Sequence, residues 1–205
     1  MKKESILIVI ILCLLAILWL CGCGSVPPTY YYTFRPDVEK NVGTASPQYP
    51  SVLAIDPFDA DVPYQQDKIV FRTSPYEVNF YEYHKWLRPL GELVTDQVVK
   101  FISAAGLFQK VHGRVSESDS NYILRGRIKM FDQWYSETTS HVRIQLEYAL
   151  MASEKEQILW MDAVETTAPV SNLKVVETVK GFETALQENV LQALTAIARV
   201  LSQRK

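Results

Sequence analysis

Three consecutive runs of alternating apolar and polar residues constrain the fold most strongly. They span residues 122–134, 141–152 and 157–167, and the short polar segment 153–156 joins the last two. Alternation at every second residue gives a strand one apolar and one polar face. Because short connections join antiparallel neighbours, the runs predict an antiparallel meander with one face exposed to solvent.

Two amphipathic helices are predicted to cover this sheet. Residues 173–202 place apolar side chains along one stripe at helical spacing, and a shorter segment that begins at Pro89 does the same until Gly106 ends it. Apolar or strand-forming runs between turn residues predict four further strands, at 30–34, 51–55, 68–72 and 107–111. The order of elements predicts an α+β fold, a mostly antiparallel sheet with two main helices packed on one face.

The N-terminus has the pattern of an export signal. Lys2 and Lys3 precede an almost unbroken apolar run over residues 5–20. This arrangement is typical of a secretory signal peptide, although a retained transmembrane helix needs only slightly more, roughly 20 apolar residues. The sequence Leu20-Cys21-Gly22-Cys23 favours the signal peptide, because it matches the bacterial lipobox.

Cys23 is the predicted site of lipid attachment. Cleavage before Cys21 would place the bulky Leu20 at the position before the cut, whereas Cys23 follows the small residue Gly22. Cys23 would then carry a diacylglycerol and an N-linked acyl chain such as palmitate, and we expect no other cofactor. In the alternative, the apolar run stays as an uncleaved anchor with incidental cysteines, and the domain is still tethered to a membrane.

Cleavage before Cys23 would divide the chain into three parts. Residues 1–22 form the signal peptide, 23–29 a short tether and 30–205 a single periplasmic domain. The mature part contains no other cysteine, so no disulfide is expected although the compartment would permit one. Gly24, rather than Asp, follows the lipidated residue. In Gram-negative sorting this predicts the outer membrane, with the domain on its periplasmic face.

Charge and motif content disfavour several classes of function. Without the signal peptide the chain carries 19 basic and 22 acidic residues, a formal charge of −3, which is a poor match for nucleic acid. His84, His112 and His141 lack ligand-like spacing for zinc, and the acidic segment 56–61 lacks the pattern of a calcium loop. We find no glycine-rich phosphate loop or nucleophile elbow, so we expect no metal and no enzymatic activity.

The stretch 69–89 is exceptionally rich in aromatic rings interleaved with charges. Tyr and Trp provide large contact areas while their polar ends stay hydrated, so the stretch suits contact with a protein, a lipid or a carbohydrate. In the alternative interpretation, the rings close the hydrophobic core or a subunit contact. The residues predicted to bind a partner are Arg72, Tyr76, Tyr81, Tyr83 and Trp86.

These features together resemble the ABC-type transport auxiliary lipoproteins, a PqiC-like family. The resemblance rests on the lipobox at Cys23, the early strand at 31–33, the stretch from Arg72 to Trp86, and residues 105–108 after the first helix. It implies a periplasmic lipoprotein that works with an MCE-domain protein and an ABC permease to move lipids between the two membranes. The family offers no catalytic residues to transfer.

The first functional hypothesis is therefore a non-enzymatic accessory subunit that docks the MCE assembly to the outer membrane, with self-association into a ring as a further possibility. A second is an envelope lipoprotein that grips peptidoglycan or another glycan through the same rings. A third, a hydrolase using Glu82 with Asp59 or Asp61, has the least support in the sequence.

Overall fold

The structure is a computed structural model of the 205-residue chain. It describes residues 26–35, 48–113, 120–136, 139–155, 157–172 and 174–203. Cys23 and the predicted signal peptide lie outside these residues, so the division of the chain at Cys23 stays a prediction. Within the described ranges, no helix is both long enough and apolar enough to cross a membrane.

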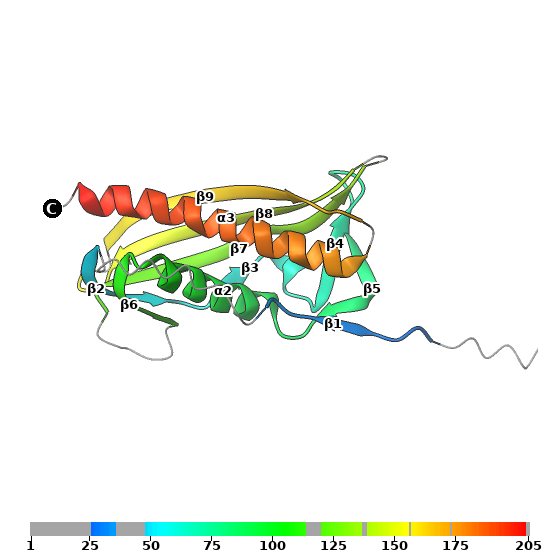
Figure 1. Ribbon diagram of the computed structural model, residues 1–205, viewed down its shortest axis with the longest axis horizontal. Helices are drawn as coiled ribbons and strands as arrows, with labels where there is room; N and C mark the ends of the chain where they lie inside the picture. Colours follow the sequence, from blue (N-terminus) through cyan, green and yellow to red (C-terminus); the bar gives the residue numbers. More distant parts are fainter. Residues whose placement is uncertain are drawn as a thin grey trace, which may run out of the picture.

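In the described part of the chain, nine strands form one curled sheet and two helices lie together on one face of it (Figure 1). A short 3-10 turn, η1, covers Val62–Tyr64. The helices are α2 (Leu90–Ala105) and α3 (Val175–Ser202). The strands are β1 (Tyr30–Tyr32), β2 (Tyr49–Ile55), β3 (Asp59–Ala60), β4 (Lys68–Arg72), β5 (Asn79–Trp86), β6 (Phe108–Gly113), β7 (Tyr122–Tyr135), β8 (Ser140–Ala152) and β9 (Gln157–Pro169).

The predicted meander is confirmed. Strand β7 pairs with β8 from Tyr122↔Ala152 to Tyr135↔Ser140, and β8 pairs with β9 along its whole length, both antiparallel. Along β8 the even-numbered side chains from Val142 to Leu150 are buried, and those between them are only partly buried or exposed. The period-2 pattern therefore marks the covered face correctly, and helix α3 packs against that face of β8 and β9.

The sheet as a whole is mixed, and the expectation of a mostly antiparallel sheet is wrong in this respect. Strands β2, β3 and β4 lie one after another along the free edge of β7, all parallel to it, opposite residues 122–124, 127–128 and 132–134. The pairs β1–β5 and β2–β6 are also parallel. One 14-residue strand thus holds three short segments in chain order, a relationship that no local pattern encodes.

The helices end and pack as their sequence patterns predict. Gly106 follows α2 in the left-handed conformation, with φ 65°, which glycine adopts without steric cost. Helix α3 buries an apolar stripe that includes Phe182, Leu186 and Val190. The ring of Phe182 stacks on Phe131 of β7 at 4.4 Å, at the centre of the core.

A buried polar contact fixes the position of α3 over the meander. The side-chain amide of Asn189 is fully buried. It donates to the carbonyl of Val164 at 2.8 Å and accepts from the hydroxyl of Tyr148 at 2.8 Å. Thr166 donates to the carbonyl of Ala185 at 2.8 Å. Because an unpaired buried amide is costly, a shift of α3 along the sheet would break this set.

The aromatic stretch contains a strand, β5, which the sequence patterns do not predict. It pairs with β4 at Val70↔Phe80 and again at Lys68↔Lys85. The two pairs are two residues apart on β4 but five residues apart on β5, so β5 bulges between Phe80 and Lys85. A bulge bends its strand and re-aims the side chains. This irregularity explains why the rings follow no simple alternation.

Candidate functional site

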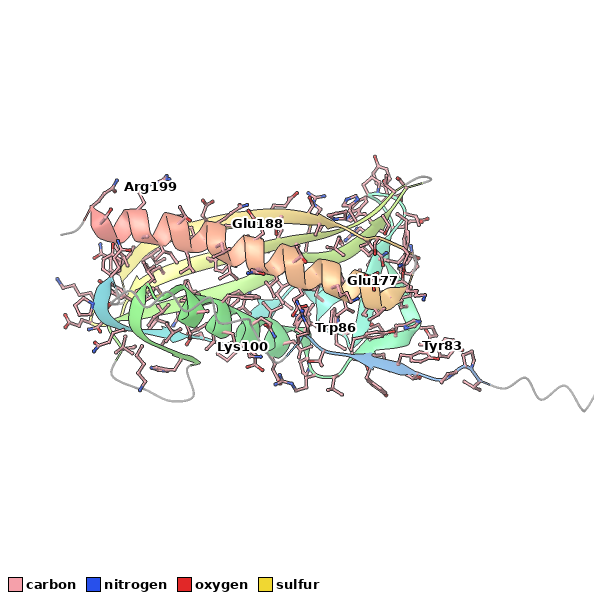
Figure 2. All side chains as sticks on the ribbon, in the orientation of Figure 1. Tyr83, Trp86, Lys100, Glu177, Glu188 and Arg199 are labelled. Atoms are coloured by element: carbon pink, nitrogen blue, oxygen red, sulfur yellow. The ribbon has the colours of Figure 1, made fainter. Side chains whose placement is uncertain are left out.

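The exposed rings gather at one end of the sheet, formed by β1, β5 and the β4–β5 connection at residues 73–78. We call it the aromatic end. Tyr30, Tyr31 and Tyr76 are 52%, 60% and 94% exposed. Figure 2 shows Tyr83 at the same end, beside β1, and Arg199 at the opposite end. Large exposed rings grouped in this way are typical of contact surfaces.

Beneath this surface, Tyr81 is held inside the domain. Its hydroxyl donates to Oε1 of Gln133 at 3.0 Å and hydrogen-bonds the hydroxyl of Tyr135, and its ring lies 4.8 Å from that of Phe71. Burial and the Tyr135 hydroxyl raise the pKa of Tyr81. Oε1 of Gln133 also accepts from Thr178 of α3 at 2.9 Å, so the network joins the aromatic end to the long helix.

His84 joins β1 to β5. Its ring stacks on Tyr30 with centroids 5.3 Å apart, and its Nδ1 hydrogen-bonds the hydroxyl of Tyr32 at 2.8 Å. Partial burial lowers the pKa of His84, which favours the neutral ring. These contacts anchor the three-residue strand β1, which pairs with β5 from Tyr30↔His84 to Tyr32↔Trp86.

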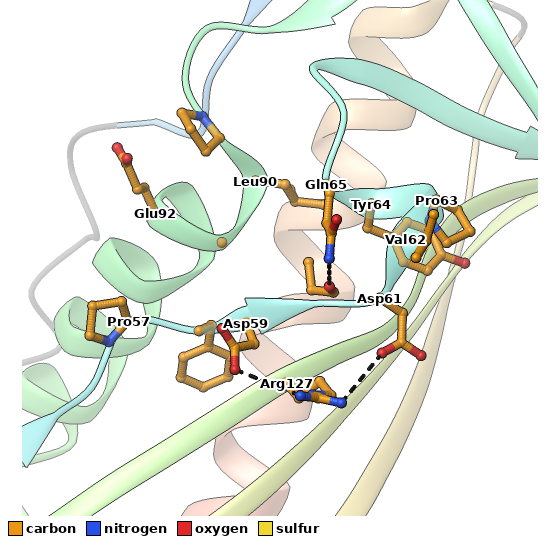
Figure 3. Close-up of a pocket in the computed structure, with 14 residues that line it drawn as sticks. Pro57, Asp59, Asp61, Val62, Pro63, Tyr64, Gln65, Leu90, Glu92 and Arg127 are labelled. Carbon is orange, nitrogen blue, oxygen red and sulfur yellow. Dashed lines mark hydrogen bonds and ion pairs between the residues drawn. The ribbon is translucent and has the colours of Figure 1, made fainter.

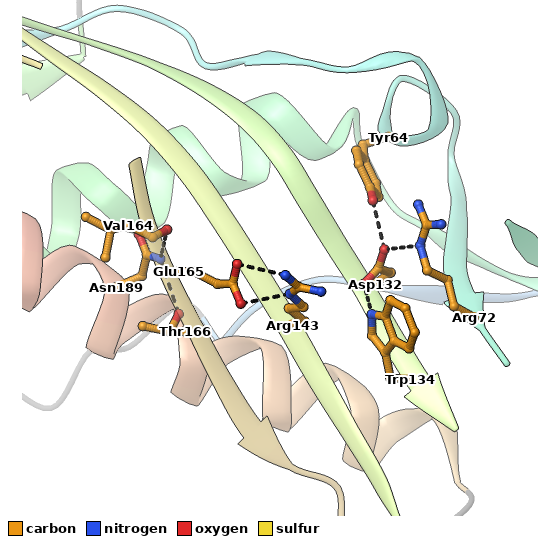
Figure 4. Close-up of polar contacts among 9 residues, drawn as sticks. All are labelled: Tyr64, Arg72, Asp132, Trp134, Arg143, Val164, Glu165, Thr166 and Asn189. Carbon is orange, nitrogen blue, oxygen red and sulfur yellow. Dashed lines mark hydrogen bonds and ion pairs between the residues drawn. The ribbon is translucent and has the colours of Figure 1, made fainter. Parts of the chain in front are cut away.

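A buried carboxylate anchors the β4–β5 hairpin to β7 (Figure 4). Oδ2 of Asp132 accepts from Nε of Arg72 at 2.6 Å and from the hydroxyl of Tyr64 at 2.9 Å, and Oδ1 accepts from Nε1 of Trp134 at 2.7 Å. Burial and the nearby Asp132 charge raise the pKa of Tyr64 to about 12. Arg143 of β8 forms a bidentate ion pair with Glu165 of β9, in which Nε and Nη2 each lie 2.9 Å from a carboxylate oxygen.

The five residues predicted to bind a partner divide into two groups. Tyr76 is fully open to solvent and Tyr83 is partly exposed. Arg72, Tyr81 and Trp86 are engaged inside the domain. Trp86 is only 3% exposed, so its ring contributes to the core and is not available to a partner without unfolding. The alternative interpretation, in which the rings close the core, is therefore correct for Trp86.

A separate open pocket of about 750 Å³ lies between η1, β3 and the start of α2 (Figure 3). Asp59 and Asp61, both on its lining, approach Arg127 at 3.8 and 4.0 Å, and Asp61 also pairs with Lys129 at 2.7 Å. Glu82 does not line the pocket and instead pairs with Lys68 at 2.7 Å. The structure therefore does not bring together the carboxylates considered for hydrolysis.

Sequence reasoning missed the polar residues that support the aromatic end, namely Asp132, Gln133 and Trp134. They occupy one end of an alternating run, where the pattern predicts that polar side chains face water. Instead both Asp132 and Gln133 are completely buried. The only local hint in the sequence is that two polar residues stand next to each other within an alternating run. This hint is not specific for buried polar side chains.

The fold occurs in other solved structures. A crystal structure of a protein from Xanthomonas campestris superposes with a TM-score of 0.73 at 20% sequence identity, covering 86% of this chain and 98% of that one. A hypothetical protein from Chlamydia trachomatis superposes with a TM-score of 0.51 at 4% identity, covering 73% of this chain and 96% of that one. At these identities the likeness shows a shared fold alone.

The sequence itself also has family relatives. No curated protein matches the chain. A family model, however, covers residues 32–194, from β1 through most of α3, and its description is the ABC-type transport auxiliary lipoprotein component. The match takes in strands β2 to β9, helix α2, most of α3 and the aromatic stretch, but not Tyr30 and Tyr31. The chain therefore belongs to the family of ABC-type transport auxiliary lipoprotein components.

Proposed function

We propose that this protein is a non-enzymatic accessory subunit of an ABC-type system that moves lipids between the two membranes. In this proposal Cys23 carries the lipid anchor in the outer membrane. The periplasmic domain docks an MCE-domain assembly that works with the ABC permease. The observation that carries the proposal is the family match over residues 32–194.

The geometry of the aromatic end supports a contact role. Two ion pairs there, Arg72–Asp132 and Lys68–Glu82 at 2.6 and 2.7 Å, engage groups that suit acid–base chemistry. The rings of Tyr30, Tyr31 and Tyr76, by contrast, reach the surface. Such a surface suits binding better than proton transfer, which requires a free acid or base within reach of a substrate.

Copies of the chain itself are also among the proposed partners. In the described part of the chain, strand β9 pairs with no strand other than β8, so it lies at one edge of the sheet. An exposed strand edge is a template for pairing with another chain. A head-to-tail contact of this kind closes into a ring when its rotation permits.

The test is photocrosslinking in cells that express the full-length protein. Probes are placed singly at Tyr76 on the aromatic end, Met161 on β9 and Leu191 on α3, which are 94%, 62% and 44% exposed. We expect at least one probe to capture an MCE-domain protein, and its position then identifies the docking face. Capture of glycan alone, or of nothing but copies of the chain from all three positions, would contradict the docking role.

A further inference from the structure

We propose that the aromatic end rests on the lipid bilayer, with the rings of Tyr30, Tyr31 and Tyr76 in the headgroup region. The domain then stands end-on, with the opposite end of the sheet directed away from the membrane. This inference rests on the proposed lipid attachment at Cys23. In this arrangement the residues of the aromatic stretch that reach solvent contact a lipid surface and not a protein.

The segment of chain between the proposed anchor and the sheet is short. Tyr30, where β1 begins, is the seventh residue after Cys23. A fully extended chain spans at most about 3.6 Å per residue, so Tyr30 lies within roughly 25 Å of the anchored residue. Pro27 and Pro28 within this segment limit its flexibility. The exposed rings of Tyr30 and Tyr31 therefore lie at the end of the domain that the tether holds near the membrane.

The topology places the remaining exposed ring at the same end. Strand β1 runs parallel to β5, with Tyr30 beside His84. The residues before Tyr30 therefore approach from the side on which β5 begins, where the β4–β5 connection carries Tyr76. Figure 1 shows β1, β4 and β5 together at this end of the elongated domain.

The opposite end lies well beyond the reach of the tether. Strand β8 starts at Ser140 beside Tyr135, the hydrogen-bond partner of Tyr81 on β5, and runs for 13 residues to Ala152. At about 3.3 Å per residue this is roughly 40 Å. Ile158, close to the β8–β9 turn and 51% exposed, marks that far end. An end-on domain keeps Ile158 away from lipid, whereas a domain lying flat does not.

The chemistry of the surface fits a bilayer interface. Tyrosine combines an apolar ring with a polar hydroxyl and is enriched at the level of the headgroups. Lys85 of β5 pairs with Asp67 at 2.9 Å, and Lys68 of the adjacent β4 pairs with Glu82 at 2.7 Å. Attraction between free cations and anionic lipids is therefore not the main force, and the contact should tolerate salt.

The hydrogen bonds behind the surface make this orientation rigid. Tyr81 and Thr178 share Oε1 of Gln133, at 3.0 and 2.9 Å, so the bulged strand β5 is connected through β7 to helix α3. The Arg72–Asp132 pair connects β4 to β7 in the same region. The rings are therefore presented by the body of the domain, and a contact through them sets the tilt of the whole molecule.

The experiment uses the full-length protein, expressed with its signal peptide and reconstituted into vesicles of phosphatidylethanolamine and phosphatidylglycerol. Single cysteines replace Tyr31, Tyr76 or Ile158, the last as the matched exposed control. After acylation at Cys23 the introduced cysteine is the only free thiol of the mature chain. It is labelled with a nitrobenzoxadiazole fluorophore, and quenching by a headgroup-labelled nitroxide lipid is measured. Mass spectrometry first establishes whether Cys23 is acylated.

We expect several-fold stronger quenching for Tyr31→Cys and Tyr76→Cys than for Ile158→Cys, with little change on adding salt. Equal quenching at all three positions means a domain lying flat and overturns the inference. Absence of quenching in acylated protein overturns it too but leaves the anchor intact. Protein that is neither acylated nor bound to vesicles overturns both. Quenching as expected without capture of an MCE-domain protein removes only the docking role.

Discussion

Arg72 and Asp132 form an ion pair of 2.6 Å between the parallel strands β4 and β7, and the Asp132 side chain is completely buried. Two further donors, Tyr64 and Trp134, complete the hydrogen bonds of the carboxylate. The pair joins the hairpin that carries the exposed Tyr76 to the longest strand of the sheet. The aromatic end therefore depends on one buried charge.

Replacing Arg72 with Met should destabilise the domain by about 3 kcal/mol, because removal of one partner leaves a buried charge without compensation. Urea unfolding followed by circular dichroism measures this change. The matched control is Arg88→Met, which removes the exposed Arg88–Asp96 pair and should cost less than about 1 kcal/mol. Equal losses for the two variants would show that Asp132 finds another partner.

Trp86→Ala should destabilise the domain by about 3–5 kcal/mol, since truncating a large buried ring leaves a cavity. The ring lies 5.4 Å from Phe34 and 5.9 Å from Phe182. Tyr76→Ala, in contrast, should change stability by no more than about 0.5 kcal/mol, because Tyr76 is 94% exposed. Thermal and urea unfolding of both variants test this difference, and a stable Trp86→Ala domain would contradict the assignment of Trp86 to the core.

Gly126→Ala should destabilise the domain by about 1–3 kcal/mol through overpacking. A Cβ at Gly126 of β7 would overlap the ring of Phe58, which packs edge-on against Tyr148. The smaller side chain of Phe58→Leu in the same protein should recover part of the loss. Gly113→Ala serves as the control, because a Cβ there meets no atom within 4 Å. A Gly126→Ala variant as stable as the control would show that Phe58 moves aside freely.

The stability of the domain should fall as the pH rises from about 10 towards 12. The pKa of Tyr64 is raised from 10.0 to about 12 by burial and by Asp132. Below pH 10 the residue is neutral in both the folded and unfolded states, and above it the unfolded chain loses its proton first. Urea unfolding at a series of pH values should give a smaller decline for Tyr64→Phe than for the unaltered protein. The exposed control Tyr76→Phe should leave the decline unchanged.

The candidate site could be predicted only in part. The ring-rich stretch identifies the right region of the chain, because aromatic density is a local property of the sequence. The distinction between Tyr76, which is open to solvent, and Trp86, which is in the core, is not local. It depends on the bulge in β5 and on the packing of Phe34 and Phe182 against the far end of that strand.

The meander of β7, β8 and β9 and the two amphipathic helices could be predicted from the sequence. The reason is that the spacing of apolar residues, every second one in a strand and every third or fourth in a helix, identifies the apolar face of each element. The sequence also supplies the lipobox at Cys23, on which the proposed anchor rests. The parallel pairing of β2, β3 and β4 along the edge of β7, by contrast, is set by contacts between distant parts of the chain. The burial of Asp132 depends on the same contacts. Hydrogen bonding between distant strands depends on how the connecting segments return through space, and neither spacing nor composition records that path.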